Sequence, residues 1–188
     1  MTELPEPAVP APDDKNWTWV LERRCPDCGF DPTQHPRDRF GVEIRRLAAT
    51  YRTLLGHGRA AERPSPEVWS ALEYGCHVRD VFRLFGERLV LMLREDAPTF
   101  ANWDQDATAV EDRYWTQDPA KVSYDLAVAA GLLADDFDRV DDGQWGRTGR
   151  RSDGASFTVE SFGVYLLHDP IHHVHDIEQG YEVLAEAG

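Results

Sequence analysis

The sequence predicts an all-α protein: one four-helix bundle over residues 38–188, with an N-terminal cover segment and a short hairpin or loop before the last helix. Two observations lead to this prediction. Four long stretches have apolar residues at helical spacing or are nearly free of helix breakers, and Gly-, Pro- or Asp-rich segments separate them. A chain of 188 residues with 41% hydrophobic content also suffices for one well-filled core and is short for two.

The first two predicted helices lie before residue 95. Over residues 38–57 apolar side chains recur at spacings of three and four, and Gly56 and Gly58 end the pattern. The Ser-Pro-Glu sequence at 65–67 supplies a cap and a first-turn proline, and the following stretch 68–94 contains almost no breaker. We expect this second helix to be the longest.

The last two predicted helices lie after residue 118. The third begins after Asp118-Pro119, has an apolar stripe, and ends at the Asp-Asp-Gly sequence 141–143. The fourth is capped by Ser156 or Thr158 and continues to about Gly180. The stripe of the third helix consists of Val122, Leu126, Ala129, Leu133 and Phe137.

The segments around these helices have no sustained period. Residues 1–15 contain four Pro and little to bury, so we expect a disordered lead. Residues 16–37 form the cover segment, with a strand or loop at Trp17–Leu21 and a tight Cys-Pro-Asp-Cys turn. We expect a structured loop over 95–118, and a turn or short hairpin over 143–155.

The charge and the cysteines restrict the partners and the compartment. With 34 acidic against 20 basic residues the net charge is −14, which disfavours nucleic acid and anionic lipid surfaces. The sequence has no run of 18 apolar residues and no signal-peptide pattern, so we expect no membrane span. Three cysteines, two of them close together, fit a reducing cytoplasm. We therefore predict a cytoplasmic protein.

Four of the seven histidines lie within nine residues of the fourth helix, together with two aspartates. Imidazole and carboxylate groups are ligands of divalent transition metals, and residues four apart on a helix point the same way. An i,i+4 pair can therefore hold one ion. The pairs that meet this condition are His168/His172, Asp169/His173 and His172/Asp176.

A helical wheel favours one of these pairs. Asp169 and His173 lie close to the edge of the apolar sector and must find polar partners there. The other histidines point away from that edge, and an alternative is that all four occupy a solvent-facing stripe. Pro170 removes a helical hydrogen bond and can kink the helix or restart it. The residues that point away are His168, His172 and His175.

His77 is the candidate for a third ligand. One helix supplies two ligands, so a further one must come from another helix of the bundle. His77 lies inside the otherwise apolar second helix, in the sequence WSALEYGCH. Taken alone, such a residue is more often a core histidine with satisfied hydrogen bonds.

Two sequence patterns resemble the DinB superfamily, which includes mycothiol-dependent maleylpyruvate isomerases and bacterial thiol S-transferases. One is WSALEYGCH on the second helix, and the other is FTVESFGVYLLHDPIHHVHDI on the last. The resemblance covers roughly residues 38–180. It implies an up-down-down-up four-helix bundle in which three side chains bind one Zn or Ni ion, often in a homodimer.

The resemblance also implies particular ligands. The family's histidine on the second helix falls on His77, and the isomerase-type pattern of an acid, a histidine and a second acid falls on Asp169, His173 and Asp176. The metal set is then His77, Asp169 and His173. This chain departs from the pattern in having the shorter Asp as the acid, and Pro170 between the ligands. A register one residue earlier stays open.

The function implied is that of a divalent-metal-dependent enzyme, a thiol-cofactor-dependent S-transferase or isomerase acting on a small electrophile. The cofactor would be a low-molecular-weight thiol such as mycothiol. The alternative is a noncatalytic metal-binding or ligand-binding bundle with a stress or regulatory role. No residue for recognising a thiol stands out, although several arginines could meet its carboxylates: Arg79, Arg83, Arg147, Arg150 and Arg151.

The sequence Cys25-Pro-Asp-Cys28-Gly has three readings. It can be a structural turn with thiols near the site, or half of a zinc knuckle. No second CxxC is present, so Cys76 and His77 would have to complete such a zinc set. A redox role requires a βαβ context, which the sequence does not suggest.

Overall fold

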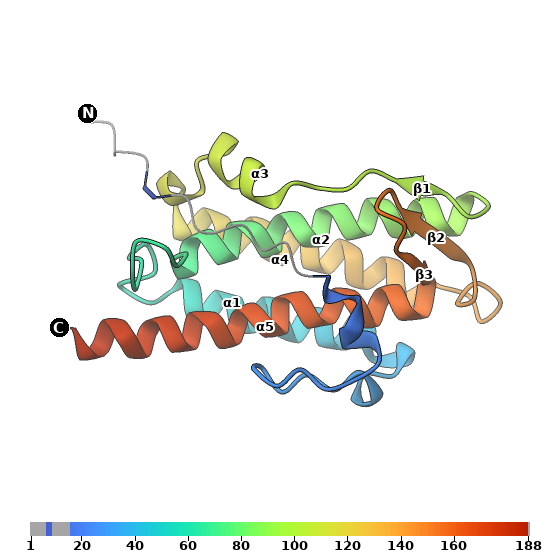
Figure 1. The fold of residues 1–188 in the computed structure, drawn as a ribbon, viewed down its shortest axis with the longest axis horizontal. Coiled ribbons are helices and arrows are strands. Elements are labelled where there is room, and N and C mark those ends of the chain that lie inside the picture. Colours follow the sequence, from blue (N-terminus) through green and yellow to red (C-terminus); the bar gives the residue numbers. More distant parts are fainter. Residues whose placement is uncertain (1–6, 9–15, 188) are drawn as a thin grey trace.

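The computed structural model of the chain describes residues 7–8 and 16–187, so the predicted disordered lead lies, apart from residues 7–8, outside the described residues. The predicted bundle is confirmed (Figure 1). Its four long helices are α1 (Phe40–Leu55), α2 (Ala71–Arg94), α4 (Pro119–Asp138) and α5 (Val159–Glu186).

The helices run up, down, down and up. In Figure 1, α1 and α5 run in one direction, and α2 and α4 run in the other. Helix α4 packs against α1 and α2, and α5 packs against the same two helices. The connection from α2 to α4 returns along the outside of the bundle, because these helices are parallel. It contains β1 (Thr99–Phe100), α3 (Gln105–Glu111) and η4 (Tyr114–Thr116).

The apolar stripes of the helices meet in one large core. Phe40 and Tyr51 of α1 are fully buried, as are side chains from the other three long helices. Gly163 permits α5 to approach α1, because a Cβ added there would lie 2.2 Å from Cε2 of Phe40. The buried partners on the other helices include Phe82, Leu89, Leu126, Leu133, Phe162 and Leu166.

Helix α2 begins three residues later than predicted. Residues 65–68 form a turn with a bridge between Ser65 and Val68, so the helix does not start at the Ser-Pro-Glu sequence. Ser70 is the N-cap instead, and it forms a capping box with Glu73. The buried Glu73 carboxylate accepts hydrogen bonds from the Ser70 backbone N–H at 2.9 Å and from Arg63. These additional bonds explain why the later start is preferred.

Helix α5 is continuous through Pro170 and extends beyond Gly180 to Glu186. Its N-cap is Thr158, which was one of the two predicted caps, Ser156 and Thr158. The buried Tyr51 hydroxyl donates a 2.9 Å hydrogen bond to the Pro170 carbonyl oxygen, which holds this part of α5 against α1. The proline therefore does not restart the helix.

A small sheet closes the end of the bundle where α5 begins. Its strands are β1, β2 (Thr148–Arg151) and β3 (Ser156–Thr158), with β2 in the centre. β1 pairs with β2 in parallel, and β2 pairs with β3 in antiparallel orientation. The hairpin expected over 143–155 is therefore present at β2 and β3. No helix among the described residues has the length and hydrophobicity needed to cross a membrane.

The cover segment lies across α5. It contains the 3₁₀ helices η1 (Trp17–Leu21) and η2 (Pro32–Gln34), and η3 (Arg37–Arg39) leads from it into α1. The prediction of a strand or loop at 17–21 was wrong, because Asn16 caps a helical turn there and Val20 is buried beneath it. The η1 turn packs on α5, where the histidines lie.

Candidate metal centre

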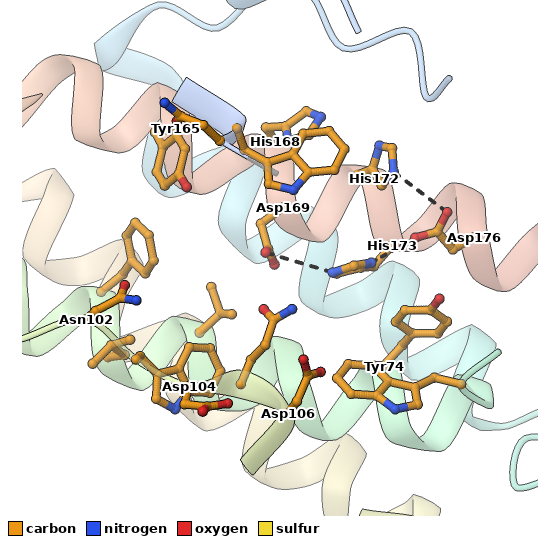
Figure 2. A pocket seen from close by; sticks show the side chains of 18 of the residues that line it. Tyr74, Asn102, Asp104, Asp106, Tyr165, His168, Asp169, His172, His173 and Asp176 are labelled. Carbon is orange, nitrogen blue, oxygen red and sulfur yellow. Dashed lines mark hydrogen bonds and ion pairs between the residues drawn. The ribbon is translucent and has the colours of Figure 1, made fainter. Parts of the chain in front are cut away.

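His77, Asp169 and His173 come together between α2 and α5. One ligand atom from each lies within 4.8 Å of the others. His77 Nε2 is 3.4 Å from Asp169 Oδ2, and His173 Nε2 is 3.8 Å from the same oxygen. Figure 2 shows Asp169 and His173 side by side on α5, directed into a pocket. Their spacing of four residues places both on the face of α5 that meets α2.

The donor set and its geometry fit a divalent transition metal. Ligands bound to Zn²⁺ at about 2.0–2.1 Å and at tetrahedral angles are about 3.4 Å apart. The His77–Asp169 separation of 3.4 Å matches this value. Two buried atoms, His77 Nδ1 and Asp169 Oδ1, have no hydrogen-bond partner among the described residues. A bound cation would compensate for the buried carboxylate.

Electrostatics keep Asp169 in the ionised form that a metal requires. Burial by itself raises the pKa of this carboxyl group, but the rings of His77 and His173 lie close to it and together lower the pKa to about 2. The side chain is 32% exposed, whereas that of His77 is 1% exposed. The carboxylate thus faces the pocket, with the His77 ring behind it.

Asp176 orients His173. Its Oδ2 lies 2.9 Å from His173 Nδ1 and accepts the hydrogen bond from that nitrogen, while Nε2 faces Asp169. A carboxylate behind a histidine ligand fixes the ring and its tautomer, an arrangement common at metal sites. The other oxygen of Asp176 is 3.8 Å from His172 Nε2.

Asp169 and His173 line a pocket of about 690 Å³, and the buried His77 ring lies next to Asp169 without lining it. Aromatic side chains form the wall next to them: Trp103 stacks on the His77 ring with centroids 5.4 Å apart, and Tyr74 lies 4.8 Å from the His173 ring. Trp69 also lines the pocket. Such rings hold the imidazoles in place and limit the access of water.

A model of the DinB superfamily matches residues 41–177. The chain belongs to the DinB superfamily. The match includes His77, Asp169, His173 and Asp176 and leaves out the cover segment. No curated protein matches this DinB-superfamily chain.

A solved structure has the same fold. YfiT from Bacillus subtilis, described as a probable metal-dependent hydrolase with an unusual four-helix bundle topology, matches with a TM-score of 0.71 and 19% sequence identity. The match covers 79% of this chain and 87% of YfiT. At 19% identity, this similarity shows that the two chains share a fold.

Two arginines, Arg88 and Arg151, also line the pocket, and Arg88 was not among the predicted candidates. Arg88 is 6% exposed and donates to the Ala101 carbonyl oxygen at 2.7 Å, while its buried Nε has no partner among the described residues. Burial, reinforced by the charge of Arg151, lowers the pKa of Arg88 to about 10. Helix α2 also contains other charged residues, so no feature of the sequence set Arg88 apart. These residues include Arg79, Asp80, Arg83 and Glu87.

The remaining arginines considered for a thiol cofactor do not line this pocket. Arg79 forms an ion pair with Asp80 at 2.7 Å, and Arg83 lies 3.0 Å from the same carboxylate. Arg147 donates to the Met92 carbonyl oxygen. Arg79 and Arg147 thus bind to neighbouring parts of the chain. Of the five arginines predicted to meet a thiol cofactor, Arg151 alone lines the pocket.

His168 and His172 are not directed into solvent, so the alternative of a solvent-facing stripe was wrong for these two residues. His168 is 4% exposed, and the rings of Trp17 and Phe30 pack on it at 5.2 and 5.3 Å. The wheel considered the bundle core alone, whereas the cover segment supplies a second apolar surface for α5. Burial and the neighbouring His172 lower the pKa of His168 to about 4, so its ring is neutral at pH 7.

The zinc set of Cys25, Cys28, Cys76 and His77 was also wrong. Cys76 is buried elsewhere, with Sγ 3.9 Å from the Tyr114 carbonyl oxygen, and it joins no cluster of metal ligands among the described residues. The Cys-Pro-Asp-Cys turn is followed by the 3₁₀ turn η2 and not by the helix of a βαβ unit, so the context of a redox CxxC is absent among the described residues.

Proposed function

We propose that this protein is a divalent-metal-dependent enzyme that acts on a small electrophile, as a thiol-dependent S-transferase or isomerase. The observation that supports this most strongly is the convergence of His77, Asp169 and His173, the last two of which line a pocket of about 690 Å³. Three protein ligands leave coordination positions free, which is typical of catalytic sites, whereas structural zinc sites have four protein ligands. The pocket volume lies within the range of small-molecule sites.

His77, Asp169 and His173 would hold the ion through two neutral imidazoles and one carboxylate. A Zn or Ni ion bound there would act as a Lewis acid, able to stabilise a thiolate or to polarise a carbonyl group. Asp176 keeps His173 in the required tautomer through the 2.9 Å bond. Trp103 holds the His77 ring by stacking.

Arg88 would bind an anionic group of the substrate or of the thiol. Its Nε is buried and has no hydrogen-bond partner among the described residues, whereas the neighbouring Arg151 is already paired with Asp153. A carboxylate is the group that a guanidinium binds best.

Two other functions can be distinguished from this one. YfiT is described as a probable metal-dependent hydrolase, and the same ligand set would serve hydrolysis if water replaced the thiol. A noncatalytic bundle would bind metal without turnover. The homodimer that the family resemblance implies stays a prediction, which light scattering of the purified protein would check.

The test is an activity screen of metal-loaded protein with small carboxylated electrophiles, with and without low-molecular-weight thiols. We expect turnover that needs both metal and thiol and that His77→Ala abolishes. His57→Ala is the matched control, because this exposed histidine lies outside the pocket. Arg88→Met should raise KM about 10–100-fold with kcat unchanged, since a charged hydrogen bond contributes about 1.5–3 kcal/mol.

Each other outcome counts against part of the proposal. Turnover without thiol would replace thiol transfer by hydrolysis. Metal binding without turnover on any substrate of the panel would favour the noncatalytic alternative.

A further inference from the structure

The two cysteines of the cover segment lie next to two of the three α5 histidines that the first site does not use. One ligand atom from each of Cys25, Cys28, His168 and His172 lies within 4.8 Å of the others. Cys25 Sγ is 3.7 Å from His172 Nδ1. Sulfur and nitrogen ligands of tetrahedral Zn²⁺, bound at about 2.3 and 2.0–2.1 Å, are about 3.6 Å apart.

We propose that Cys25, Cys28, His168 and His172 form a structural zinc site that fastens the cover segment to α5. Two thiolates and two imidazoles in tetrahedral arrangement are the ligand set that Zn²⁺ prefers. All four positions come from protein side chains, so this site differs from the three-residue centre in having no open position. The two sites share no residue.

The backbone presents the two thiols to the same point. Cys25 and Cys28 flank a tight turn in which Gly29 N–H donates to the Cys25 carbonyl oxygen at 3.0 Å. Gly29 has φ +75, a conformation that other residues rarely adopt. Cys25 N–H donates to the Phe30 carbonyl oxygen at 2.8 Å and closes the loop. Both cysteines are free thiols, with no disulfide between them.

The histidines are also arranged as ligands. They are four residues apart on α5, on the helix face adjacent to that of Asp169 and His173 (Figure 2). His168 Nε2 is buried and has no hydrogen-bond partner among the described residues. His172 has Nδ1 towards Cys25 and Nε2 at 3.8 Å from Asp176, a carboxylate behind the ring.

The site would connect the cover segment to the pocket. Asn16 and Trp17 line the pocket, and the Trp17 ring lies 5.2 Å from His168 and 5.1 Å from His172. Isolated 3₁₀ turns are weak elements. A zinc ion that ties residues 25 and 28 to α5 would therefore hold this wall of the pocket in position.

Cobalt substitution tests this inference independently of any catalytic activity. Apoprotein kept reduced and titrated with Co²⁺ should bind two ions, with thiolate-to-cobalt charge-transfer absorption and the intense visible bands of a tetrahedral sulfur-containing site. His77→Ala should lose one ion and keep these bands. A Cys25→Ser/Cys28→Ser double variant should lose the bands and keep the ion at His77.

Cys76→Ser is the matched control, because this third cysteine is buried outside the cluster, and it should retain the full spectrum. Absence of charge-transfer absorption from reduced wild-type protein would overturn the inference, whatever the variants do. Loss of the bands in Cys76→Ser with retention in the double variant would overturn it as well.

Discussion

At the scale of single residues, Asp176 links the two groups of ligands on α5. Oδ2 accepts from His173 Nδ1 at 2.9 Å, and Oδ1 lies 3.8 Å from His172 Nε2. Its closer partner is the histidine of the pocket site. One carboxylate thus fixes the ring that faces Asp169 and also lies behind a histidine that faces Cys25.

We predict that Asp176→Asn weakens metal binding at the pocket site about 10–100-fold without abolishing it, because the carboxylate orients His173 but does not bind the ion itself. Competition with a chelator of known affinity measures the effect. Glu178→Gln, an exposed acid two residues further along, is the control and should leave the affinity unchanged. Equal affinities for Asp176→Asn and wild type would mean that this bond has no role.

The candidate pocket site was largely predictable at this scale. The i,i+4 spacing and the family resemblance together indicated His77, Asp169 and His173, which the structure brings together. The choice of register could not be decided from the sequence, since the pairs Asp169/His173 and His168/His172 each face a different partner. The partner of the second pair lies on another segment: Cys25 and His172 are 147 positions apart, and helical periodicity carries no information about such a contact.

At the scale of elements, the long return connection between α2 and α4 is attached to α2 through Tyr114. This residue is fully buried, and its hydroxyl donates a 2.7 Å hydrogen bond to Asp80 Oδ2. Burial works against the ionised form of Asp80, but bonds from Arg79 and Tyr114 lower the pKa of this carboxyl group. Trp103 belongs to the same connection, so its attachment helps to position the pocket wall.

Tyr114→Phe should lower the free energy of unfolding by about 1.5–3 kcal/mol, the usual contribution of a hydrogen bond to a charged group. Urea denaturation followed by circular dichroism measures it as a lower midpoint with an unchanged slope. Tyr124→Phe is the control, because Tyr124 is 70% exposed and should change stability by less than about 0.5 kcal/mol. Identical midpoints for the two variants would contradict this role for Tyr114.

Helix starts could be predicted where one capping sequence was present, and less well where two capping sequences lay close together. Asp118-Pro119 and Thr158 mark true helix starts. The Ser-Pro-Glu sequence before α2 was misleading because the Ser70–Glu73 capping box, three residues later, forms more hydrogen bonds. The sheet could be expected only as a hairpin, since β1 pairs with β2 from about 50 residues away in sequence.

In the molecule as a whole, the bundle and the cover segment differ in how many side chains they bury. The bundle buries a large core between four long helices. The cover segment contributes Val20, Cys25 and Phe30 as buried hydrophobic side chains and has only 3₁₀ turns. Its attachment through a metal would compensate for this small core.

Removal of the zinc should therefore loosen the cover segment without unfolding the bundle. Arg23 and Arg24 are exposed, so trypsin should cut after them faster in chelator-treated protein than in zinc-loaded protein. Mass spectrometry of the fragments over time gives the rates. Cys76→Ser should behave as wild type does. Equal cutting rates with and without metal would show that the segment is held by packing alone.

Helix α5 is expected to bind two ions on adjacent faces, one of them at the pocket. Anomalous diffraction at the metal absorption edge, from crystals of zinc-loaded protein, tests it most directly because it locates each ion. We predict one peak between His77, Asp169 and His173, and a second between Cys25, Cys28, His168 and His172. Well-ordered electron density for His77, Asp169 and His173 with no anomalous peak between them would contradict the account.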